Sequence, residues 1–208
     1  MSEHMALENL TVLDLTRVLA GPFCTMMLAD MGANVIKIEV PKGGDDTRSY
    51  PPFRAKNLNG ERESVYFANI NRNKKGITLN LKAPEGKEIF KELVKKADIV
   101  VENYRPGVMD KLGLGYDVLK EINPRIIYAA VSGFGCYGPY HLRPGYDILA
   151  QAMGGMMSIT GSKGGEPTRA GSALGDILGG LHVTIGILAA VNARTITGKG
   201  QRAVSYTH

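Results

Sequence analysis

Short apolar runs rich in Val, Ile and Leu alternate with helical segments along much of the chain. The first forty residues show this most clearly, with strand signals at residues 10–15 and 34–39 and a helical segment at residues 23–31 between them. Pro22 suits the first turn of that helix, and Gly32 stops it. A strand, a helix and a strand within about thirty residues are typical of a right-handed βαβ crossover. The two strands are therefore expected to be parallel.

The alternation continues beyond a long loop at residues 41–64. Further apolar runs predict strands, and amphipathic or short helical segments separate them. The strands are expected at residues 76–81, 98–101 and 126–132, and the helices from Pro84 onward and at residues 108–112 and 116–122. This order of elements predicts an α/β fold, a Rossmann-like parallel sheet with flanking helices.

The last sixty residues differ in character. Residues 146–159 and 176–196 are predicted to be helical and are rich in Gly, Ala and Met. Small residues on helix surfaces let two backbones approach closely, so these helices are expected to pack tightly. Gly198 and Gly200 end the second helix.

Composition excludes several classes of protein. With 44% hydrophobic and 22% charged residues, the chain is not expected to be disordered. It has no run of about eighteen apolar residues, so no transmembrane helix is expected, and residues 1–9 show no secretory signal. Its two cysteines, Cys24 and Cys136, are too few for a disulfide framework. We therefore expect a soluble, cytoplasmic protein without a membrane partner.

Positive charge is concentrated in one early region. The chain has 25 Lys and Arg against 20 Asp and Glu, and residues 37–75 hold nine of the former and five of the latter. A basic loop region favours an anionic partner, although an ordinary solvated surface explains such an excess as well. The charge alone does not choose between these interpretations.

Several common motifs are absent from the sequence. The turn after the first predicted strand lacks G-x-G-x-x-G, and no phosphate-binding G-x-x-x-x-G-K-[ST] loop occurs. No G-x-S-x-G elbow is present, which weakens a serine hydrolase interpretation. The four histidines are scattered without paired spacing, so no metal site is expected.

One carboxylate, Asp176, lies among small residues at the expected start of the last long helix. Two interpretations are open. An aspartate at this position is a favoured N-cap, a role worth about 1 kcal/mol. It is alternatively a nucleophile, with Gly175 and other glycines leaving room for a bulky substrate and backbone N–H groups stabilising an oxyanion. Asp147 opens the preceding helix and allows the same N-cap interpretation.

A more specific signal comes from several stretches between Leu10 and Gln201. In chain order they read LDLTRVLAGPFCTMMLADMGANVIKIE, NRNKKGITLNLK, ADIVVENYRPGVMDKLGLGYDVL, INPRIIYAAVSGFG, RPGYDILAQAMGGMMSITG, LGDILGGLH and TGKGQ. Together they resemble the class III CoA-transferases, the CaiB/BaiF family. Several motifs in the right order are far more specific than any one of them.

This resemblance implies a function and a set of site residues. The nucleophile falls on Asp176 and a second motif carboxylate on Asp147. The CoA contacts fall on Arg17, Val18, Leu79, Lys82, Asn103, Tyr104, Arg105, Lys111 and Tyr146. The enzyme would move CoA from an acyl-CoA donor to a carboxylic acid, with a short dicarboxylic acid as the expected acceptor, through an aspartyl anhydride and an aspartyl-CoA thioester. CoA is then a substrate, and neither a permanently bound cofactor nor a nucleic-acid partner is expected.

Two positions depart from patterns found in the family. Val40 follows Glu39, where some relatives place an arginine that stacks near the adenine of CoA. Leu19 stands where formyl-CoA transferases carry a glutamine, which argues against a specialist for formate or oxalate.

Two other functions stay open. The α-methylacyl-CoA racemases of the same fold need a histidine before the second motif aspartate, because an acid/base pair must remove and return an α-proton. Here Tyr146 precedes Asp147, and tyrosine, with an ordinary pKa of about 10, is a poor base at neutral pH. The chain is alternatively a CoA-binding fragment without turnover.

The resemblance also bears on domains and assembly. Residues 1–200 are expected to form the N-terminal portion of the large, CoA-binding domain, and residues 201–208 an atypical tail. Class III members are longer, with a small domain, a C-terminal return to the first domain and an interlocked homodimer. The chain is therefore expected to be truncated relative to the family, and its early positive charge is expected to face the CoA phosphates.

Overall fold

Six parallel strands form the centre of the described part of the chain. In this computed structural model, which describes residues 4–54, 60 and 62–206, the strand order is β3-β2-β1-β4-β5-β6. The strands are β1 (Thr11–Asp14), β2 (Asn34–Glu39), β3 (Lys75–Thr78), β4 (Ile99–Glu102), β5 (Ile127–Ser132) and β6 (Arg202–Tyr206). Neighbouring strands pair in parallel throughout the sheet. The predicted parallel α/β fold is confirmed.

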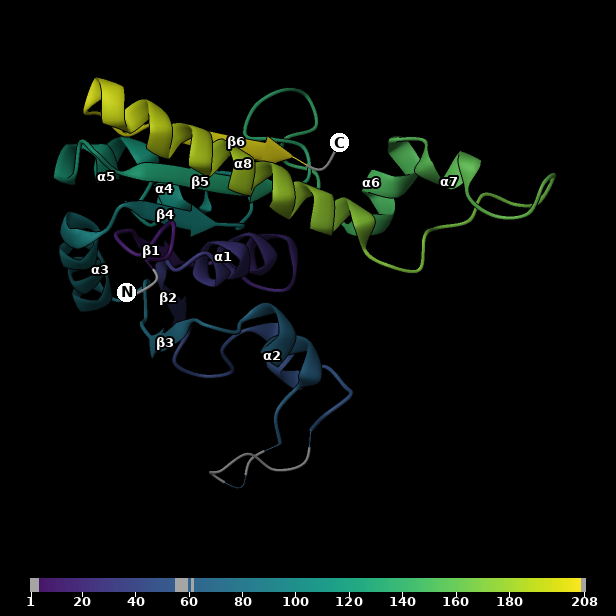
Figure 1. The fold of residues 1–208 in the computed structure, drawn as a ribbon, viewed down its shortest axis with the longest axis horizontal. Helices are drawn as coiled ribbons and strands as arrows, with labels where there is room; N and C mark the ends of the chain where they lie inside the picture. The colour runs from purple at the N-terminus through teal and green to yellow at the C-terminus, as the bar shows by residue number, and fades with distance from the viewer. Residues whose placement is uncertain (1–3, 55–59, 61, 207–208) are drawn as a thin grey trace.

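Helices cover both faces of the sheet (Figure 1). The α-helices of the described residues are α1 (Ala20–Asp30), α2 (Val65–Ile70), α3 (Pro84–Lys96), α4 (Val108–Lys111), α5 (Tyr116–Ile122), α6 (Asp147–Met153), α7 (Met156–Ile159) and α8 (Leu174–Thr197), of which α6 and α7 extend away from the sheet. α1 and α8 pack on one face, where Val12 and Ile187 belong to one buried cluster. α3 and α5 pack on the other, where Leu13, Phe90 and Leu119 are buried. Because successive strand residues face opposite layers, an uninterrupted apolar strand serves both cores.

The strand order reverses between β1 and β4. From β1 the sheet extends through β2 to β3 on one side, and from β4 through β5 to β6 on the other. The turns that follow β1 and β4 therefore leave the sheet in opposite directions, and a crevice opens between them. Ligands of open parallel sheets bind in crevices of this kind, so the topology indicates where a site can lie.

The structure differs from the sequence-based expectation in a few elements. The strand predicted at residues 34–39 coincides with β2, whereas residues 146–159 form two short helices instead of one. The break falls at Gly154 and Gly155, and Gly155 has a φ of +79° that a helix does not accommodate. α2 was not predicted. Residues 202–206, part of the expected tail, form β6 beside β5, while the division into domains stays a prediction.

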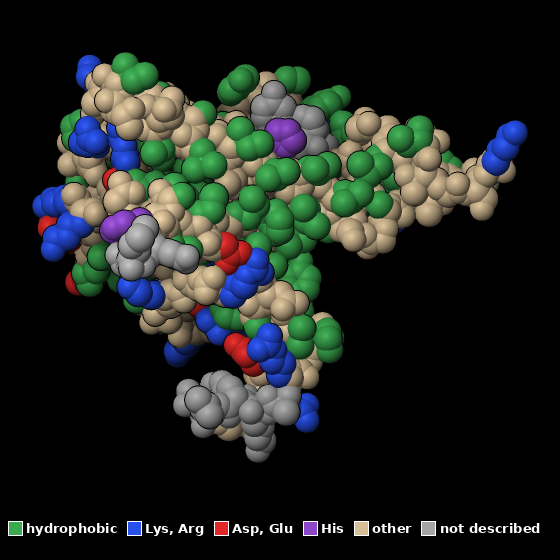
Figure 2. All heavy atoms as spheres, viewed as in Figure 1, with side chains coloured by type: hydrophobic (Ala, Val, Ile, Leu, Met, Phe, Trp, Pro, Cys, Tyr) green, Lys and Arg blue, Asp and Glu red, His purple; other side chains and the backbone are tan. Residues whose placement is uncertain are grey.

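α8 is long and apolar enough to cross a membrane by length and composition. This is weak evidence for a span, because the core helix of a soluble protein passes the same test. The helix lies along β5 and β6 and packs against α1. Its outer face carries the exposed side chains of Leu178, Ile185 and Ile196. Figure 2 shows hydrophobic side chains gathered along α8 and at the base of the arm formed by α6 and α7.

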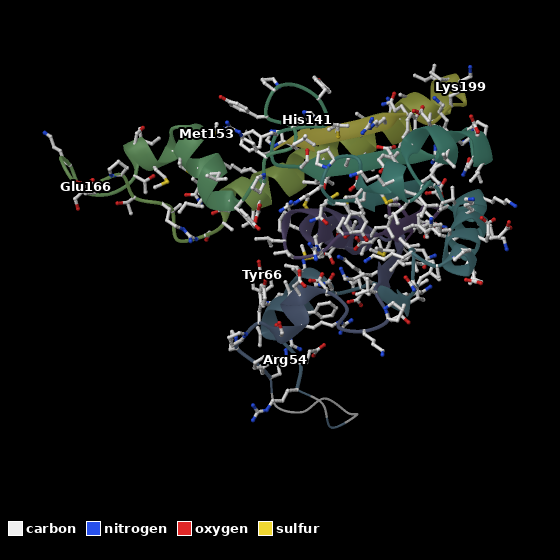
Figure 3. All side chains as sticks on the ribbon, turned by 180° about the vertical axis from the view of Figure 1, so that it is seen from behind. Arg54, Tyr66, His141, Met153, Glu166 and Lys199 are labelled. Carbon is white, nitrogen blue, oxygen red and sulfur yellow. The ribbon has the colours of Figure 1, made fainter. Side chains whose placement is uncertain are left out.

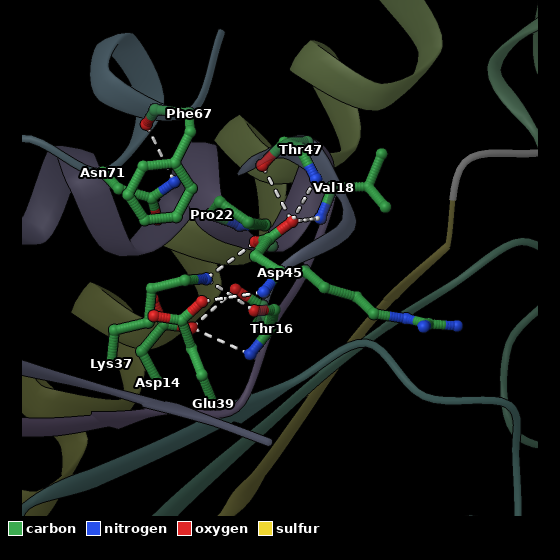
Figure 4. A network of polar contacts seen from close by, with 12 residues as sticks. Asp14, Thr16, Val18, Pro22, Lys37, Glu39, Asp45, Thr47, Phe67 and Asn71 are labelled. Carbon is green, nitrogen blue, oxygen red and sulfur yellow. Dashed lines mark hydrogen bonds and ion pairs between the residues drawn. The ribbon is translucent and has the colours of Figure 1, made fainter. Parts of the chain in front are cut away.

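Two buried ion pairs lie beneath the crevice. Lys74 Nζ donates to Asp14 Oδ2 at 3.0 Å, and Lys37 Nζ donates to Asp45 Oδ2 at 2.9 Å. All four side chains are 2% exposed or less. Lys37 also donates to the backbone carbonyl of Thr16, as Figure 4 shows. The pairs therefore join β1, β2, the loop after β2 and the segment before β3.

These pairs neutralise part of the positive charge that is concentrated in residues 37–75. Burial alone would raise the pKa of Asp14 and Asp45, but the ammonium groups of Lys74 and Lys37 and hydrogen bonds from threonines outweigh it and lower both pKa values. Arg48 likewise donates to both carboxylate oxygens of Glu39. Lys37 and Lys74 are buried with their carboxylates, so the expectation of a phosphate-facing surface does not hold for these two, while the half-exposed Arg48 pairs with Glu39.

Removing one member of a buried pair leaves the other charge uncompensated. We expect Asp45→Ala, which leaves Lys37 without its carboxylate, to lower the free energy of unfolding by about 3–5 kcal/mol. The neighbouring Asp46 pairs with Arg17 at the surface, where both side chains are half exposed or more. Asp46→Ala is therefore expected to cost less than about 1 kcal/mol. Urea unfolding of the two variants checks this, and equal losses would contradict it.

Candidate active site

A cavity of about 480 Å³ opens at the carboxyl ends of β1, β4 and β5. This is the place where the strand order reverses. Its walls come from residues 17–20 after β1, residues 103–106 after β4, residues 131–133 at the end of β5, residues 143–146 and Asp176. The volume is typical of a small-molecule site.

Hydrogen bonds tie the turns on either side of the crevice together. The backbone N–H of Arg17 donates to Asn103 Oδ1 at 2.9 Å, and Asn103 Nδ2 donates to the carbonyl of Arg17 at 2.7 Å. Val18 follows with a φ of +68°, a conformation that β-branched residues rarely adopt. Its N–H donates to Asp45 Oδ1 at 3.2 Å. The buried ion pairs thus hold a strained turn at the cavity, and such strain is common at ligand sites.

Gly133 and Gly145 allow two backbone segments to meet in another wall of the cavity. Gly133 follows β5 and Gly145 precedes α6, and a Cβ on Gly145 would lie 2.1 Å from Gly133 Cα. No side chain fits at such a close approach. The two backbones therefore touch, which places residues 143–146 in the cavity wall and starts α6 beside α8.

Asp176 is the third residue of α8 and lines the cavity. Across the described ranges 4–54, 60 and 62–206, its carboxylate has no hydrogen bond or ion pair. Burial raises the pKa of this carboxyl and the negative charge of Asp147 raises it further, to about 6. The N-cap interpretation of Asp176 is wrong, because the helix begins at Leu174 and its N-cap is Ala173.

Both carboxylate oxygens of Asp147 are occupied. Oδ1 accepts from the Gly175 N–H at 2.8 Å, and Oδ2 accepts from Gln151 Nε2 at 2.8 Å. Asp147 therefore caps α8 from a neighbouring helix. Gly175 packs against α6, where a Cβ would lie 2.7 Å from Ala150 Cβ. The expectation that this glycine leaves room for substrate is wrong, because Ala150 of α6 fills the space beside it and Asp147 of α6 accepts its N–H.

The residues predicted to contact CoA divide into two groups. Those that line the cavity are Arg17, Val18, Asn103, Tyr104, Arg105 and Tyr146. Leu79 packs against the core beneath α3, and Lys82 and Lys111 are exposed away from the cavity lining. Contact with CoA stays a prediction for all of them. Leu19 lines the cavity, and Val40 is exposed.

Positive charge in the cavity wall comes from Arg17, Arg105 and Arg143. Guanidinium groups match phosphate oxygens in geometry as well as charge, so the cavity suits an anionic ligand. Within the part of the chain that the structure describes, no group of three or more His, Cys, Asp or Glu side chains is placed to hold a metal ion.

The sequence analysis did not predict two side chains of this region as candidate site residues. Arg143 lies 4.0 Å from the ring centroid of Tyr140, and its place directly before Pro144 in a quoted motif could have revealed it. Tyr66 rises from α2 toward the start of α8 (Figure 3). Burial and the charge of Asp176 raise the pKa of Tyr66 to about 12, so its hydroxyl stays protonated as a hydrogen-bond donor. No pattern in the sequence marks Tyr66.

Comparison with known proteins places these features in a family context. The sequence model of CoA-transferase family III matches residues 7–205. The chain is 50% identical to an acetyl-CoA:oxalate CoA-transferase from Acetobacter aceti, over 93% of this chain and 48% of that protein. It is also 50% identical to a succinyl-CoA:glutarate CoA-transferase from Mus musculus, over 93% of this chain and 43% of that protein.

A solved structure shares the fold. A CaiB/BaiF family protein from Brucella suis superposes with a TM-score of 0.94 and 45% identity, covering 99% of this chain and 54% of that one. The chain thus spans about half the length of the relatives it matches.

Glu102 lies behind the cavity wall at the end of β4. It is 8% exposed, and its carboxylate accepts from the Tyr104 N–H at 2.7 Å and from the Tyr128 hydroxyl at 3.1 Å. Burial, which outweighs these two hydrogen bonds, raises the pKa of Glu102 to about 7. The proton on Glu102 is therefore bound more tightly in the folded chain than in the unfolded one.

A raised pKa in the folded state predicts a loss of stability as pH rises. The contribution of Glu102 is fully present below its ordinary pKa of about 4.3 and is lost as the pH approaches about 7. Glu102→Gln lacks this titration. The melting temperature of the variant minus that of the unaltered chain is therefore expected to be larger at about pH 8 than at about pH 5. Thermal unfolding at both pH values checks this, with the exposed Glu121→Gln as control. A difference that does not change with pH would contradict it.

Proposed function

The chain belongs to CoA-transferase family III, and we propose that it moves CoA from an acyl-CoA donor to a carboxylic acid with Asp176 as the nucleophile. The observation that carries this proposal is the Asp176 carboxylate, which faces the cavity without a partner in the described residues. A carboxylate with a pKa near 6 is ionised at neutral pH and is more basic than an ordinary aspartate. Both properties favour attack on a thioester.

The first half of the reaction transfers CoA to the protein. A carboxylate oxygen of Asp176 attacks the thioester carbonyl of the donor, and the C–S bond breaks to give a mixed anhydride and CoA thiolate. The thiolate then attacks the aspartyl carbonyl of the anhydride. An aspartyl-CoA thioester forms, and the donor leaves as its free carboxylate.

The second half repeats these steps in the other direction. The acceptor carboxylate attacks the carbonyl of the aspartyl thioester. The C–S bond breaks, CoA thiolate departs, and a mixed anhydride of Asp176 and the acceptor forms. The thiolate then attacks the acceptor carbonyl, which releases the acceptor acyl-CoA and restores the Asp176 carboxylate. No electrons are exchanged with an oxidant or reductant.

Each step passes through a tetrahedral oxyanion, so electrostatic stabilisation matters more than a general base. Asp176 lies in the first turn of α8, where the helix dipole favours negative charge. The Gly175 N–H is already bonded to Asp147, so the oxyanion needs other donors. The protonated hydroxyl of Tyr66 is one candidate, since the charge of Asp176 acts on it and helps to raise its pKa.

The cavity offers groups that suit the charged part of CoA. Arg105 and Arg143 line it, and Arg17 reaches it while holding Asp46 in an exposed ion pair. Exposed pairs are worth about 0–1 kcal/mol, so a phosphate can replace Asp46 as the partner of Arg17 at little cost. We propose that these arginines contact the phosphates of CoA.

The proposed acceptor is a short dicarboxylic acid. Two relatives at equal identity are named for oxalate and for glutarate, so identity does not choose between acceptors. Leu19 at the cavity wall presents an apolar surface where an amide would bind a small polar acid, which favours a longer acceptor than formate or oxalate.

Two other functions make different predictions. A racemase acting on α-methylacyl-CoA incorporates deuterium from solvent at the α-carbon without any acceptor acid. A CoA-binding fragment binds CoA tightly without exchange between acids. The homodimer, a cytoplasmic location, and the absence of a resident cofactor, a nucleic-acid partner and a membrane partner stay predictions.

Trapping the covalent intermediates tests the proposed function. After incubation with succinyl-CoA, hydroxylamine converts an activated aspartyl group to a hydroxamate, and borohydride reduces it to the alcohol. Mass spectrometry is expected to find the modification on Asp176 and not in Asp176→Asn. Asp117→Asn, at a side chain that is 86% exposed on α5, is expected to label normally. Labelling at another residue would refute the assignment of the nucleophile.

A further inference from the structure

Gln151 is a buried polar residue that the proposed chemistry does not use. It lies on α6 four residues after Asp147 and is 2% exposed. Its Oε1 accepts from the Ala170 N–H at 2.8 Å. Its Nε2 donates to Asp147 Oδ2 at 2.8 Å and to the carbonyl of Ser172 at 3.2 Å. A buried amide with three partners strongly constrains the structure around it, because each lost hydrogen bond leaves a buried polar group unpaired and lowers stability.

The partners of Gln151 fix the orientation of its amide. The Ala170 N–H can only donate, whereas the Asp147 carboxylate and the Ser172 carbonyl can only accept. A flipped amide would face a like group at every contact. The side chain therefore links α6 to the segment at residues 170–172, which leads directly into α8.

The connection from Gln151 to Asp176 runs through Asp147. With Oδ2 held by Gln151, the carboxylate of Asp147 is turned so that Oδ1 reaches the Gly175 N–H. Ala173, the N-cap of α8, supplies no side-chain bond of its own. The position of the first turn of α8, and of Asp176 within it, therefore depends on a side chain that Gln151 holds in place.

We propose that Gln151 is a positioning residue for the nucleophile, holding Asp147 and the 170–172 segment so that α8 presents Asp176 to the cavity. The term nucleophile rests on the proposed function, whereas the hydrogen bonds exist without turnover. The other titratable and charged groups of this region are Tyr66 on α2, on which the charge of Asp176 acts, and the arginines at positions 17, 105 and 143, which line the same cavity as Asp176. None of them is a hydrogen-bond partner of Gln151.

Titration of Asp176 tests the proposal without requiring activity. In Gln151→Met the carboxylate of Asp147 loses its tether and moves away, and the 170–172 segment opens to water. Both changes are expected to lower the pKa of Asp176, by about half a unit or more, in carbon-13 NMR of the aspartyl carboxyl groups. Asp147→Asn, which removes the charge directly, gives the size of the full electrostatic effect. The exposed Gln201→Met is the control and is expected to leave the titration unchanged.

A milder variant keeps the test decisive if Gln151→Met does not fold. Gln151→Asn retains a polar amide in the same place but is one methylene too short to reach all three partners, so a smaller fall in the pKa of Asp176 is expected. An unchanged Asp176 titration in either folded variant would overturn the proposal.

Kinetics of trapping separate positioning from binding. The rate at which Asp176 is labelled at saturating succinyl-CoA is expected to fall at least about tenfold in Gln151→Met, with half-saturation within about twofold, because the cavity arginines lie on other segments. A rise in half-saturation alone would assign Gln151 to substrate binding instead. If the unaltered chain is not labelled at Asp176 while its titration still depends on Gln151, the proposed function fails and the positioning role stands.

Discussion

The fold and the cavity both depend on the buried pairs Asp14–Lys74 and Lys37–Asp45. A charge removed from water is tolerated only where a partner compensates it. Here the partners come from β1, from β2, from the loop after β2 and from the segment before β3. Compensating the charges therefore draws these elements together. Since Asp45 also accepts from the N–H of Val18, the core of the sheet and the wall of the cavity are held by the same carboxylate.

The other side of the cavity rests on an unequal pair of carboxylates. Asp147 has a hydrogen bond at each oxygen, and Asp176 has none among the described residues. The bonded carboxylate fixes the start of α8, and its charge adds to the effect of burial in raising the pKa of Asp176. Environments that differentiate two nearby carboxyl groups assign them different roles. Here one positions the helix and the other is available for chemistry.

The sequence predicts local structure well and contacts between distant segments poorly. Residues 34–39 and 116–122 were predicted correctly, because apolar runs and helical periodicity are local properties. The resemblance of its motif predicts Asp176 as a nucleophile, which stays a prediction, whereas its spacing also allowed an N-cap, which the structure excludes. The partners of Asp14 and Gln151 could not be predicted, since Lys74 and Ala170 lie 60 and 19 residues away along the chain. Sequence alone predicts that a lysine in a strand, such as Lys37, is exposed. Only the folded structure shows that Lys37 is buried and pairs with Asp45.

The cavity walls come from segments that begin at Arg17 and end at Asp176. A chain that has formed only part of the sheet therefore has no complete cavity, however well its local helices are made. A ligand of this cavity would need the assembled sheet, and a ligand selective for the native state stabilises that state by mass action. Under the proposed function, occupancy of the cavity would therefore report on completion of the fold as a whole, and a bound substrate would protect the folded chain from proteolysis.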